Sequence, residues 1–367
     1  MYNGIRAAKT FDRCADASRR SLRNMQKKII KVSAVLCLAI FVYFIIRADP
    51  GELLRIIGRL SPIGILLLIL LRCLFWAIRT VSWRLVLSRC SCEPVPFSTL
   101  FGAELAGHAI GYFTPSAKLG GDAIRAMMLH PVPNNKSLAS VVIDKTIELI
   151  STILMMSLGL VITLLSIRMG STQRIVFLSL TAFLAVLVFI LFRQQKKGLF
   201  IWILDTLKKM RIKFKYAETK RERLAETDKI ISAFYSRHRR TFLNSFILYI
   251  AMVLLWVAEM HLSFYFLGLH AITPLKSFLI TTLGIVANIV PVIPAGIGIY
   301  DMSYLPIFAM FRIPLRFGIA VVLLRRLLNL LLAVVGLLPM LRMRKHPPAQ
   351  ETAVLPLAST ATETVQS

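Results

Sequence analysis

Long apolar runs separated by short polar segments make up most of this chain. A helix that crosses a bilayer needs about 20 mainly apolar residues, within a range of about 17 to 25. Runs of this length or longer predict six membrane-spanning helices, at Ile29–Ile46, Pro62–Leu87, Leu138–Ile167, Ile175–Phe192, Phe242–Leu267 and Leu315–Leu341. The fourth of these runs contains no charged residue, and we expect it at the lipid-facing edge of the molecule.

Two further apolar segments are too short to span a bilayer and are interrupted by proline and glycine. In the first, Phe97–Phe113 and Asp122–His130 flank the segment Pro115–Gly121, and in the second Leu275–Val290 precedes Met302–Phe311. An interrupted helix is tolerated at membrane depth only where it is buried in protein or lines a wet cavity. We therefore predict two re-entrant helical hairpins, with backbone breaks at Pro115, Gly120, Gly121, Pro291, Pro294, Gly296 and Gly298.

The order of these elements predicts an internal repeat. A span, a hairpin and a second span follow one another twice, and the two sets run through the membrane in opposite directions. Inverted repeats in transporters place the substrate near the midplane, between broken helices. The predicted fold is an all-α polytopic membrane protein with about six full transmembrane helices and two re-entrant hairpins in an inverted-repeat arrangement.

The distribution of charge predicts how the chain lies in the membrane. The 367 residues are 56% hydrophobic and 17% charged, and the net charge is +27. Residues 1–28 hold eight Lys or Arg against two Asp, and residues 193–240 hold fifteen against five acids. Because basic loops stay on the cytoplasmic side, we expect a multi-pass protein of the cell (cytoplasmic) membrane with both termini inside. Residues 29–342 form the transmembrane domain, and residues 343–367 form a disordered tail.

The excess positive charge suits anionic lipid headgroups as partners, and we expect no nucleic-acid partner. Within the basic loop, apolar residues at 203, 207, 210 and 214 recur at helical spacing. This spacing suits a helix lying on the membrane surface. A solvated basic loop fits the same segment, and both interpretations stay open.

Ionisable residues also occur inside or beside the apolar runs. The acids are Glu104, Asp122, Asp144, Glu148, Glu259 and Asp301, and the bases include Arg72, Arg79, Lys118, Arg125, Lys145, Arg325 and Arg326. A buried charge without a partner costs several kcal/mol, so these groups are paired or wet. Two interpretations follow: a static network of salt bridges that holds the hairpins, or a polar groove that passes a lipid headgroup.

The sequence lacks the motifs of several other classes of protein. It has no G-x-x-x-x-G-K-[ST] loop, no H-E-x-x-H pair and no nucleophile elbow. The five cysteines form no C-x-x-C pair, so neither a zinc site nor a disulfide framework is indicated. We therefore expect no enzyme, no cofactor, no catalytic residue and no bound metal.

Four motifs in order resemble one known family. P-S-A-K-L-G-G-D-A-I-R, S-L-A-S-V-V-I-D-K-T-I-E-L-I, P-A-G-I-G-I-Y-D and V-V-L-L-R-R-L-L resemble the transmembrane region of lysylphosphatidylglycerol synthase, also called the flippase-like family. The resemblance covers roughly residues 30 to 342. In the best-understood members this region is similar to a flippase that moves aminoacylated phosphatidylglycerol to the outer leaflet. Those members also carry a soluble aminoacyl-transfer domain, and related ones are associated with isoprenoid-linked lipids.

The resemblance also implies roles for single residues. The family's first motif falls on Gly120, Gly121, Asp122 and Arg125, and its second on Asp144, Lys145 and Glu148. The glycine loop and its acid fall on Gly296, Gly298 and Asp301, and the late arginine on Arg326. We expect a substrate path for a headgroup and its phosphate at Lys118, Asp122, Arg125, Asp144, Lys145, Glu148, Asp301, Arg325 and Arg326.

The main hypothesis is a lipid translocator for an anionic or aminoacylated phospholipid or a polyprenyl lipid. Arg125, Lys145 and Arg326 would contact the phosphate, because guanidinium groups suit it geometrically. The alternative is a non-transporting lipid-binding subunit that holds a separate lipid synthase or glycosyltransferase, with the loop 193–240 as its docking surface. An intramembrane lipid-modifying enzyme is a third hypothesis, and would require the acids for product formation.

Overall fold

The computed structural model describes residues 46, 50–58, 60–113, 119–129, 132–167, 170–195, 221–287 and 299–343. Within these ranges the chain forms α-helices joined by short connections and contains no β-strand. The protein is therefore the all-α polytopic membrane protein that the sequence predicts. Residues 29–45 of the first predicted span, the segment 203–214, the breaks at 114–118 and 288–298, and the tail after 343 lie outside the described residues.

Among the described residues, four helices are long and apolar enough to cross a membrane. They are α3 (Pro62–Cys90), α6 (Asn134–Ser166), α11 (Arg239–Phe266) and α14 (Leu315–Met343). Each coincides with a predicted span to within a few residues. Ser61 shows how the sequence sets one of these starts: its hydroxyl accepts the backbone N–H of Gly64 at 3.0 Å, and Pro62 fills the first helical position. The total of six spans remains a prediction.

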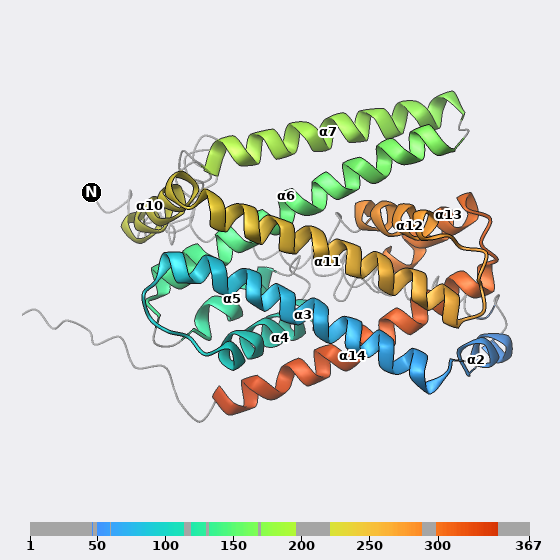
Figure 1. Ribbon diagram of the computed structural model, residues 1–367, viewed down its shortest axis with the longest axis horizontal. Coiled ribbons are helices and arrows are strands. Elements are labelled where there is room, and N and C mark those ends of the chain that lie inside the picture. Colours follow the sequence, from blue (N-terminus) through green and yellow to red (C-terminus); the bar gives the residue numbers. More distant parts are fainter. Residues whose placement is uncertain are drawn as a thin grey trace, which may run out of the picture.

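The fourth predicted span, Ile175–Phe192, forms α7 (Ser171–Gln195), which lies along one edge of the bundle (Figure 1). Its large apolar side chains are mostly exposed, among them Phe183 and Phe189. In a membrane protein such a surface is covered by lipid, because lipid tails are as apolar as the side chains. The position of α7 confirms that this segment is peripheral.

Four shorter helices form two pairs, as the interrupted segments predict. They are α4 (Phe97–Phe113) with α5 (Leu119–Met127), and α12 (Pro274–Ala287) with α13 (Ile299–Met310). The two pairs occupy opposite halves of the bundle along its long axis (Figure 1). The structure corrects one boundary: α5 begins at Leu119, so Gly120 and Gly121 lie in its first turn and not in the break before it.

The helices pack in a pattern that maps one half of the chain onto the other. The two long helices α3 and α11 lie side by side and run in opposite directions (Figure 1). The arm α4 packs against α14, and the corresponding arm α12 packs against α6. Gly336 of α14 faces the backbone of Leu105, and Gly159 of α6 faces the side chain of Thr282. Each hairpin therefore packs on the last helix of the other half, as an inverted repeat requires.

Two described helices do not appear in the sequence prediction. The short helix α2 (Pro50–Gly58) packs against α14. Helix α10 (Arg221–Arg237) lies inside the basic segment 193–240 and buries Ile231, Phe234 and Tyr235 against α6 and its neighbours. Burial raises the pKa of the Tyr235 hydroxyl. The sequence pattern did not predict α10 because the many charged residues of this segment obscure its apolar positions.

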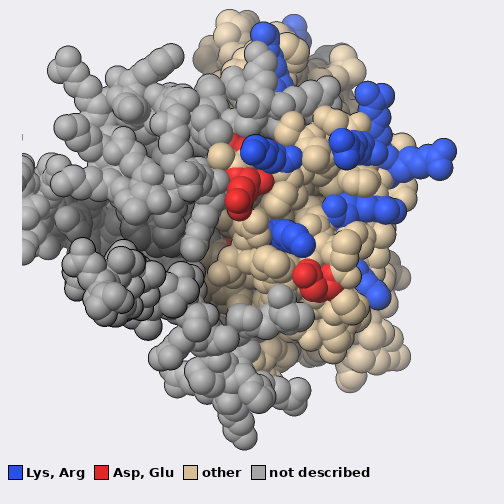
Figure 2. All heavy atoms as spheres, turned by 90° about the vertical axis from the view of Figure 1, so that its left-hand side faces the viewer, with Lys and Arg blue, Asp and Glu red and all other residues tan. Residues whose placement is uncertain are grey.

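Basic residues gather on the end of the bundle where α10 lies. Figure 2 shows Lys and Arg spread over this end, with few acids among them. The residues come from the last turns of α3, from α10 and from the first turn of α11, and they include Arg84, Arg89, Lys229, Arg237, Arg239 and Arg240, all of which are exposed. The α4–α5 pair enters the bundle from this same end (Figure 1).

Candidate functional site

A buried arginine stands at the centre of the α4–α5 half of the bundle. The side chain of Arg125, on α5, is 2% exposed and contacts carboxylates of three helices. Its guanidinium donates to Glu104 of α4, to Asp144 of α6 at 2.7 Å and to Asp122 of its own helix at 3.2 Å. The ring of Trp83 lies 4.4 Å from the guanidinium carbon, which adds a cation–π contact.

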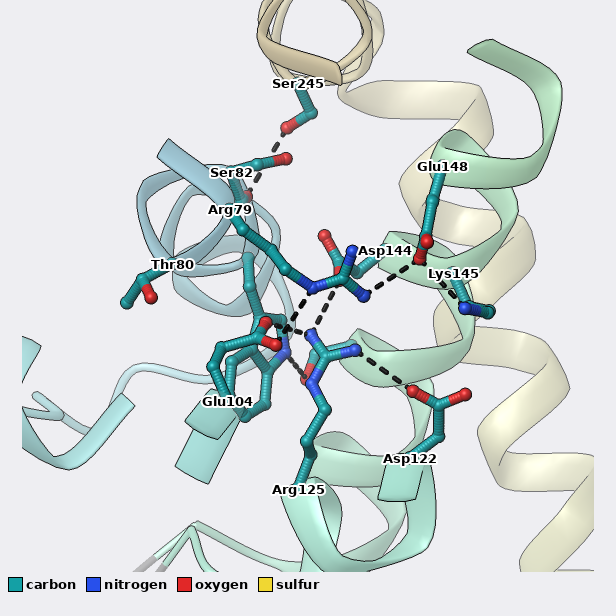
Figure 3. A network of polar contacts seen from close by, with 12 residues as sticks. Arg79, Thr80, Ser82, Glu104, Asp122, Arg125, Asp144, Lys145, Glu148 and Ser245 are labelled. Atoms are coloured by element: carbon teal, nitrogen blue, oxygen red, sulfur yellow. Dashed lines mark hydrogen bonds and ion pairs between the residues drawn. The ribbon is translucent and has the colours of Figure 1, made fainter. Parts of the chain in front are cut away.

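A second arginine lies beside it and shares one of its partners. The Nε of Arg79, on α3, donates to Oε2 of Glu104 at 3.0 Å, and its Nη2 donates to Glu148 at 2.9 Å. Glu148 also accepts Lys145 at 3.0 Å. Figure 3 shows the guanidinium groups of Arg79 and Arg125 close together, with the acids around them. We call this set the first cluster: Arg79, Glu104, Asp122, Arg125, Asp144, Lys145 and Glu148.

A tyrosine of α11 completes the first cluster. The hydroxyl of Tyr249 donates to Oδ1 of Asp144 at 2.7 Å, and both residues are buried. Asp144 thus holds Tyr249 with one oxygen and Arg125 with the other. The first cluster therefore joins the consecutive helices α3, α4, α5 and α6 to α11, which comes later in the chain.

Close helix packing brings the short helix α5 to this position. A methyl group added to Gly121 of α5 would collide with the backbone carbonyl of Gly107 in α4. A methyl group at Gly107 would likewise collide with Arg125. Only glycine allows two backbones to approach this closely. Gly121, which the sequence predicted as a backbone break, is therefore a packing contact that holds α5 close to α4.

A second cluster of charges lies in the other half of the bundle. Arg72 of α3 donates to Glu259 of α11 and to Asn329 of α14, each at 2.7 Å. The Nε of Arg325, also on α14, lies 3.6 Å from the same carboxylate oxygen of Glu259. The ring of Trp256 lies 5.5 Å from the Arg325 guanidinium carbon. We call Arg72, Glu259, Arg325 and Asn329 the second cluster.

Two residues of each cluster lie at corresponding positions of α6 and α14. Asp144 lies ten residues after the first residue of α6, and Arg325 lies ten residues after the first residue of α14. Glu148 and Asn329 each follow one helical turn later. An acid pair in one half is therefore replaced by a base and an amide in the other.

The structure brings together some of the predicted site residues and separates others. Asp122, Arg125, Asp144, Lys145 and Glu148 meet in the first cluster, but Arg325 lies in the second cluster. The contact of Arg325 with Glu259 places it outside the first cluster, and its role in a substrate path stays a prediction. Arg326 is partly exposed on α14. Lys118, Pro115, Pro291, Pro294, Gly296, Gly298 and the side chain of Asp301 lie outside the described part of the chain.

Sequence reasoning missed several members of the clusters. Arg79, Glu104, Arg72 and Glu259 stood out as charges inside apolar runs, but no motif marked them as site residues. Tyr249 and Asn329 gave no signal, because one tyrosine or asparagine in an apolar helix is ordinary. Among the residues described here, no group of three or more His, Cys, Asp or Glu has the arrangement of a metal site.

A sequence model described as the lysylphosphatidylglycerol synthase TM region matches residues 29–336. The match covers most of the chain, including every residue of both clusters. The chain belongs to this family. As a member of the lysylphosphatidylglycerol synthase TM region family, it is a multi-pass membrane protein with a lipid-related role.

Two UPF0104 membrane proteins are similar to this chain over nearly their whole length, and a third is similar over a shorter segment. A UPF0104 membrane protein of Pyrococcus horikoshii is 24% identical over 321 residues, which are 83% of this chain and 93% of the relative. One of Methanocaldococcus jannaschii is 24% identical over 341 residues, or 88% of this chain and 98% of the relative. A third, of Methanothermobacter thermautotrophicus, is 33% identical over 101 residues, 28% of this chain and 29% of the relative.

Proposed function

We propose that this protein moves a lipid with an anionic phosphate headgroup from one leaflet of the cytoplasmic membrane to the other. The first cluster is the site that receives the headgroup, and the acyl chains stay in the surrounding lipid. The observation that carries this proposal is the pair of buried guanidinium groups, Arg79 and Arg125, at the end of a short interrupted helix pair. Two adjacent guanidinium groups present parallel N–H donors that match the oxygens of a phosphate.

The arrangement of the helices supports a route through the protein. The first cluster lies beside the α4–α5 pair, and the second lies in the half that contains the α12–α13 pair. Arg79 and Arg72 are both on α3, seven residues apart, which is about 10.5 Å along a helix. A headgroup that leaves the first cluster therefore meets the second cluster about two helical turns further along α3.

The basic end of the bundle sets the orientation that we propose. Lys and Arg prefer the cytoplasmic side of a membrane, so the end that carries α10 faces the cytoplasm. The α4–α5 pair is then a re-entrant hairpin open to the cytoplasmic leaflet, and α12–α13 is a re-entrant hairpin open to the outer leaflet. This orientation places both termini in the cytoplasm.

A matched pair of substitutions on α3 tests the proposal. Purified protein is reconstituted into liposomes that contain fluorescent phosphatidylglycerol, and transfer between leaflets is measured by quenching of the outer leaflet. Arg79→Lys keeps the charge but loses the forked donor geometry, so we expect transfer to fall at least tenfold. Arg84→Lys makes the same change at an exposed position of the same helix, and we expect transfer at the wild-type rate.

The alternative function predicts a different result in the same preparation. A lipid-binding subunit for a separate synthase or glycosyltransferase would bind lipid without moving it. Wild-type protein that is folded but gives no transfer of phosphatidylglycerol, of its aminoacylated form or of a polyprenyl phosphate would overturn the translocator proposal. A stoichiometric partner that is lost when residues 196–220 are deleted would then support the subunit.

A further inference from the structure

We propose that Glu104 is a proton-binding site, and that one proton enters the first cluster together with each anionic headgroup. The proposal rests on the proposed function and names the ion that is coupled to it. Its basis is that a carboxylate and a phosphate compete for the same donors. Glu104 already occupies the two guanidinium groups that a headgroup needs.

Glu104 differs from the other acids of the first cluster in what it contacts. Both hydrogen-bonding partners of its carboxylate among the described residues are the guanidinium groups of Arg79 and Arg125. Asp144 has the hydroxyl of Tyr249 as well, and Glu148 has the ammonium group of Lys145. The side chain of Asp122 is 19% exposed and can take up water. Glu104 is thus the acid that loses both of these partners when a phosphate binds the two arginines.

The surroundings of Glu104 do not stabilise a charge that has lost its arginines. Its side chain is 1% exposed. Among the described residues, the charged and titratable groups near it are Arg79 on α3, Asp122 and Arg125 on α5, Asp144 on α6, and His108 one turn along its own helix. Helix α14 meets α4 in part through Gly336 and Pro339, which carry no charge.

A buried carboxylate without a cationic partner is unfavourable by several kcal/mol, and it takes up a proton instead. Headgroup binding therefore proceeds with a balanced exchange. The phosphodiester, with a charge of −1, takes the hydrogen bonds of the two guanidinium groups, and the Glu104 carboxylate accepts one H⁺ from water to become a neutral carboxylic acid. One anion and one proton enter together, so the net charge of the first cluster stays the same.

The charge balance of this exchange determines which gradient across the membrane can drive lipid transfer. The transfer of a singly charged anionic headgroup with one proton moves no net charge across the membrane. A pH gradient then drives transfer in the direction of proton flow, and an electrical potential across the membrane has no effect on it. The proton also explains how a headgroup can displace a strong buried ion pair without leaving a bare charge behind.

The experiment measures proton uptake and lipid binding in the same sample. Full-length protein in detergent and weak buffer, with a pH-sensitive dye, is titrated with dioctanoylphosphatidylglycerol, its lysyl ester and farnesyl phosphate. For the lipid that binds, we expect uptake of about one proton per lipid in the wild type. Glu104→Gln keeps the shape and one acceptor oxygen, so we expect binding at least as tight, with no proton uptake.

Two further variants separate the possible results. Asp144→Asn changes an acid that shares Arg125 with Glu104, and it reports whether Asp144 takes up the proton in place of Glu104. Glu226→Gln changes an exposed acid on α10 and is the control for the substitution itself. Folding of each variant is checked by its thermal midpoint and its elution in size-exclusion chromatography.

Each outcome decides one of the two proposals. Lipid binding by the wild type without proton uptake overturns the role of Glu104 and leaves the translocator standing. Proton uptake that persists in Glu104→Gln and disappears in Asp144→Asn assigns the proton to Asp144 and overturns the proposal as well. Failure of all three lipids to bind to the folded wild type overturns the proposed function, and with it the proposed coupling of proton uptake to lipid binding.

Discussion

Glu104 on α4 accepts hydrogen bonds from two arginines of different helices, Arg79 through one carboxylate oxygen and Arg125 through the other. Three helices thus meet at a single side chain. If both arginines leave, the buried Glu104 carboxylate loses both of these partners, whereas each arginine keeps another acid, Glu148 for Arg79 and Asp144 for Arg125. These two hydrogen bonds hold the α4–α5 pair against α3. They also place the Glu104 carboxylate where a bound phosphate would accept the same hydrogen bonds.

The contact between Gly121 and Gly107 predicts the effect of a single methyl group. Gly121→Ala forces α5 away from α4, because the added carbon collides with the Gly107 carbonyl oxygen. Overpacking of this kind destabilises by about 1–3 kcal/mol. We expect a lower thermal midpoint and slower lipid transfer. Gly170→Ala is the matched control, since nothing lies within 4 Å of the added carbon there. Equal thermal midpoints for the two variants would argue against close packing at Gly121.

Tyr249 provides a test of the hydrogen bond that completes the first cluster. Tyr249→Phe removes the hydroxyl that donates to Asp144 and leaves the ring in place. A hydrogen bond to a charged group contributes about 1.5–3 kcal/mol, and we expect the thermal midpoint to fall accordingly. Tyr265→Phe makes the same change at an exposed position near the end of the same helix. An unchanged midpoint in Tyr249→Phe would mean that Oδ1 of Asp144 finds a donor that replaces the Tyr249 hydroxyl.

In the second cluster, we expect substitution of Glu259 and substitution of its partner Arg72 to lower the thermal midpoint by different amounts. Glu259 contacts both Arg72 and Arg325, whereas Arg72 also has Asn329. Removing one partner of a buried pair costs about 3–5 kcal/mol, because the other charge is left behind. We expect Glu259→Gln to lower the thermal midpoint more than Arg72→Gln does, since the first change affects two guanidinium groups. The opposite order would show that Arg325 does not depend on Glu259.

The buried face of α10 leads us to expect a large loss of stability from a substitution within the basic segment 193–240. Phe234 is 1% exposed and packs with the residues of α6 and α11. Phe234→Ala removes a buried ring, at a cost of about 3–5 kcal/mol. We expect a marked fall in the thermal midpoint. Phe183→Ala removes the same ring from the exposed surface of α7, and we expect a much smaller change. Similar midpoints for both variants would show that α10 is not docked.

The sequence by itself determined the long helices and the two short helix pairs of this protein, and the class to which it belongs. Apolar runs of the length of a bilayer specify long helices, and proline and glycine limit the short ones, because both effects depend on neighbours along the chain. The ends of α4 and the span α3 follow from such local rules. The pairing of Lys145 with Glu148 was also visible, because residues three apart share a helix face.

Only the tertiary structure decided which charges meet. Arg125 pairs with Glu104 and Asp144 because Gly121 lets α5 approach α4, and no local pattern encodes that distance. Packing between the two halves, by contrast, places Arg325 with Glu259 and away from the first cluster. A buried charge takes whichever partner the helix packing brings within reach. The sequence could therefore name the charges, and the fold alone could sort them into two clusters.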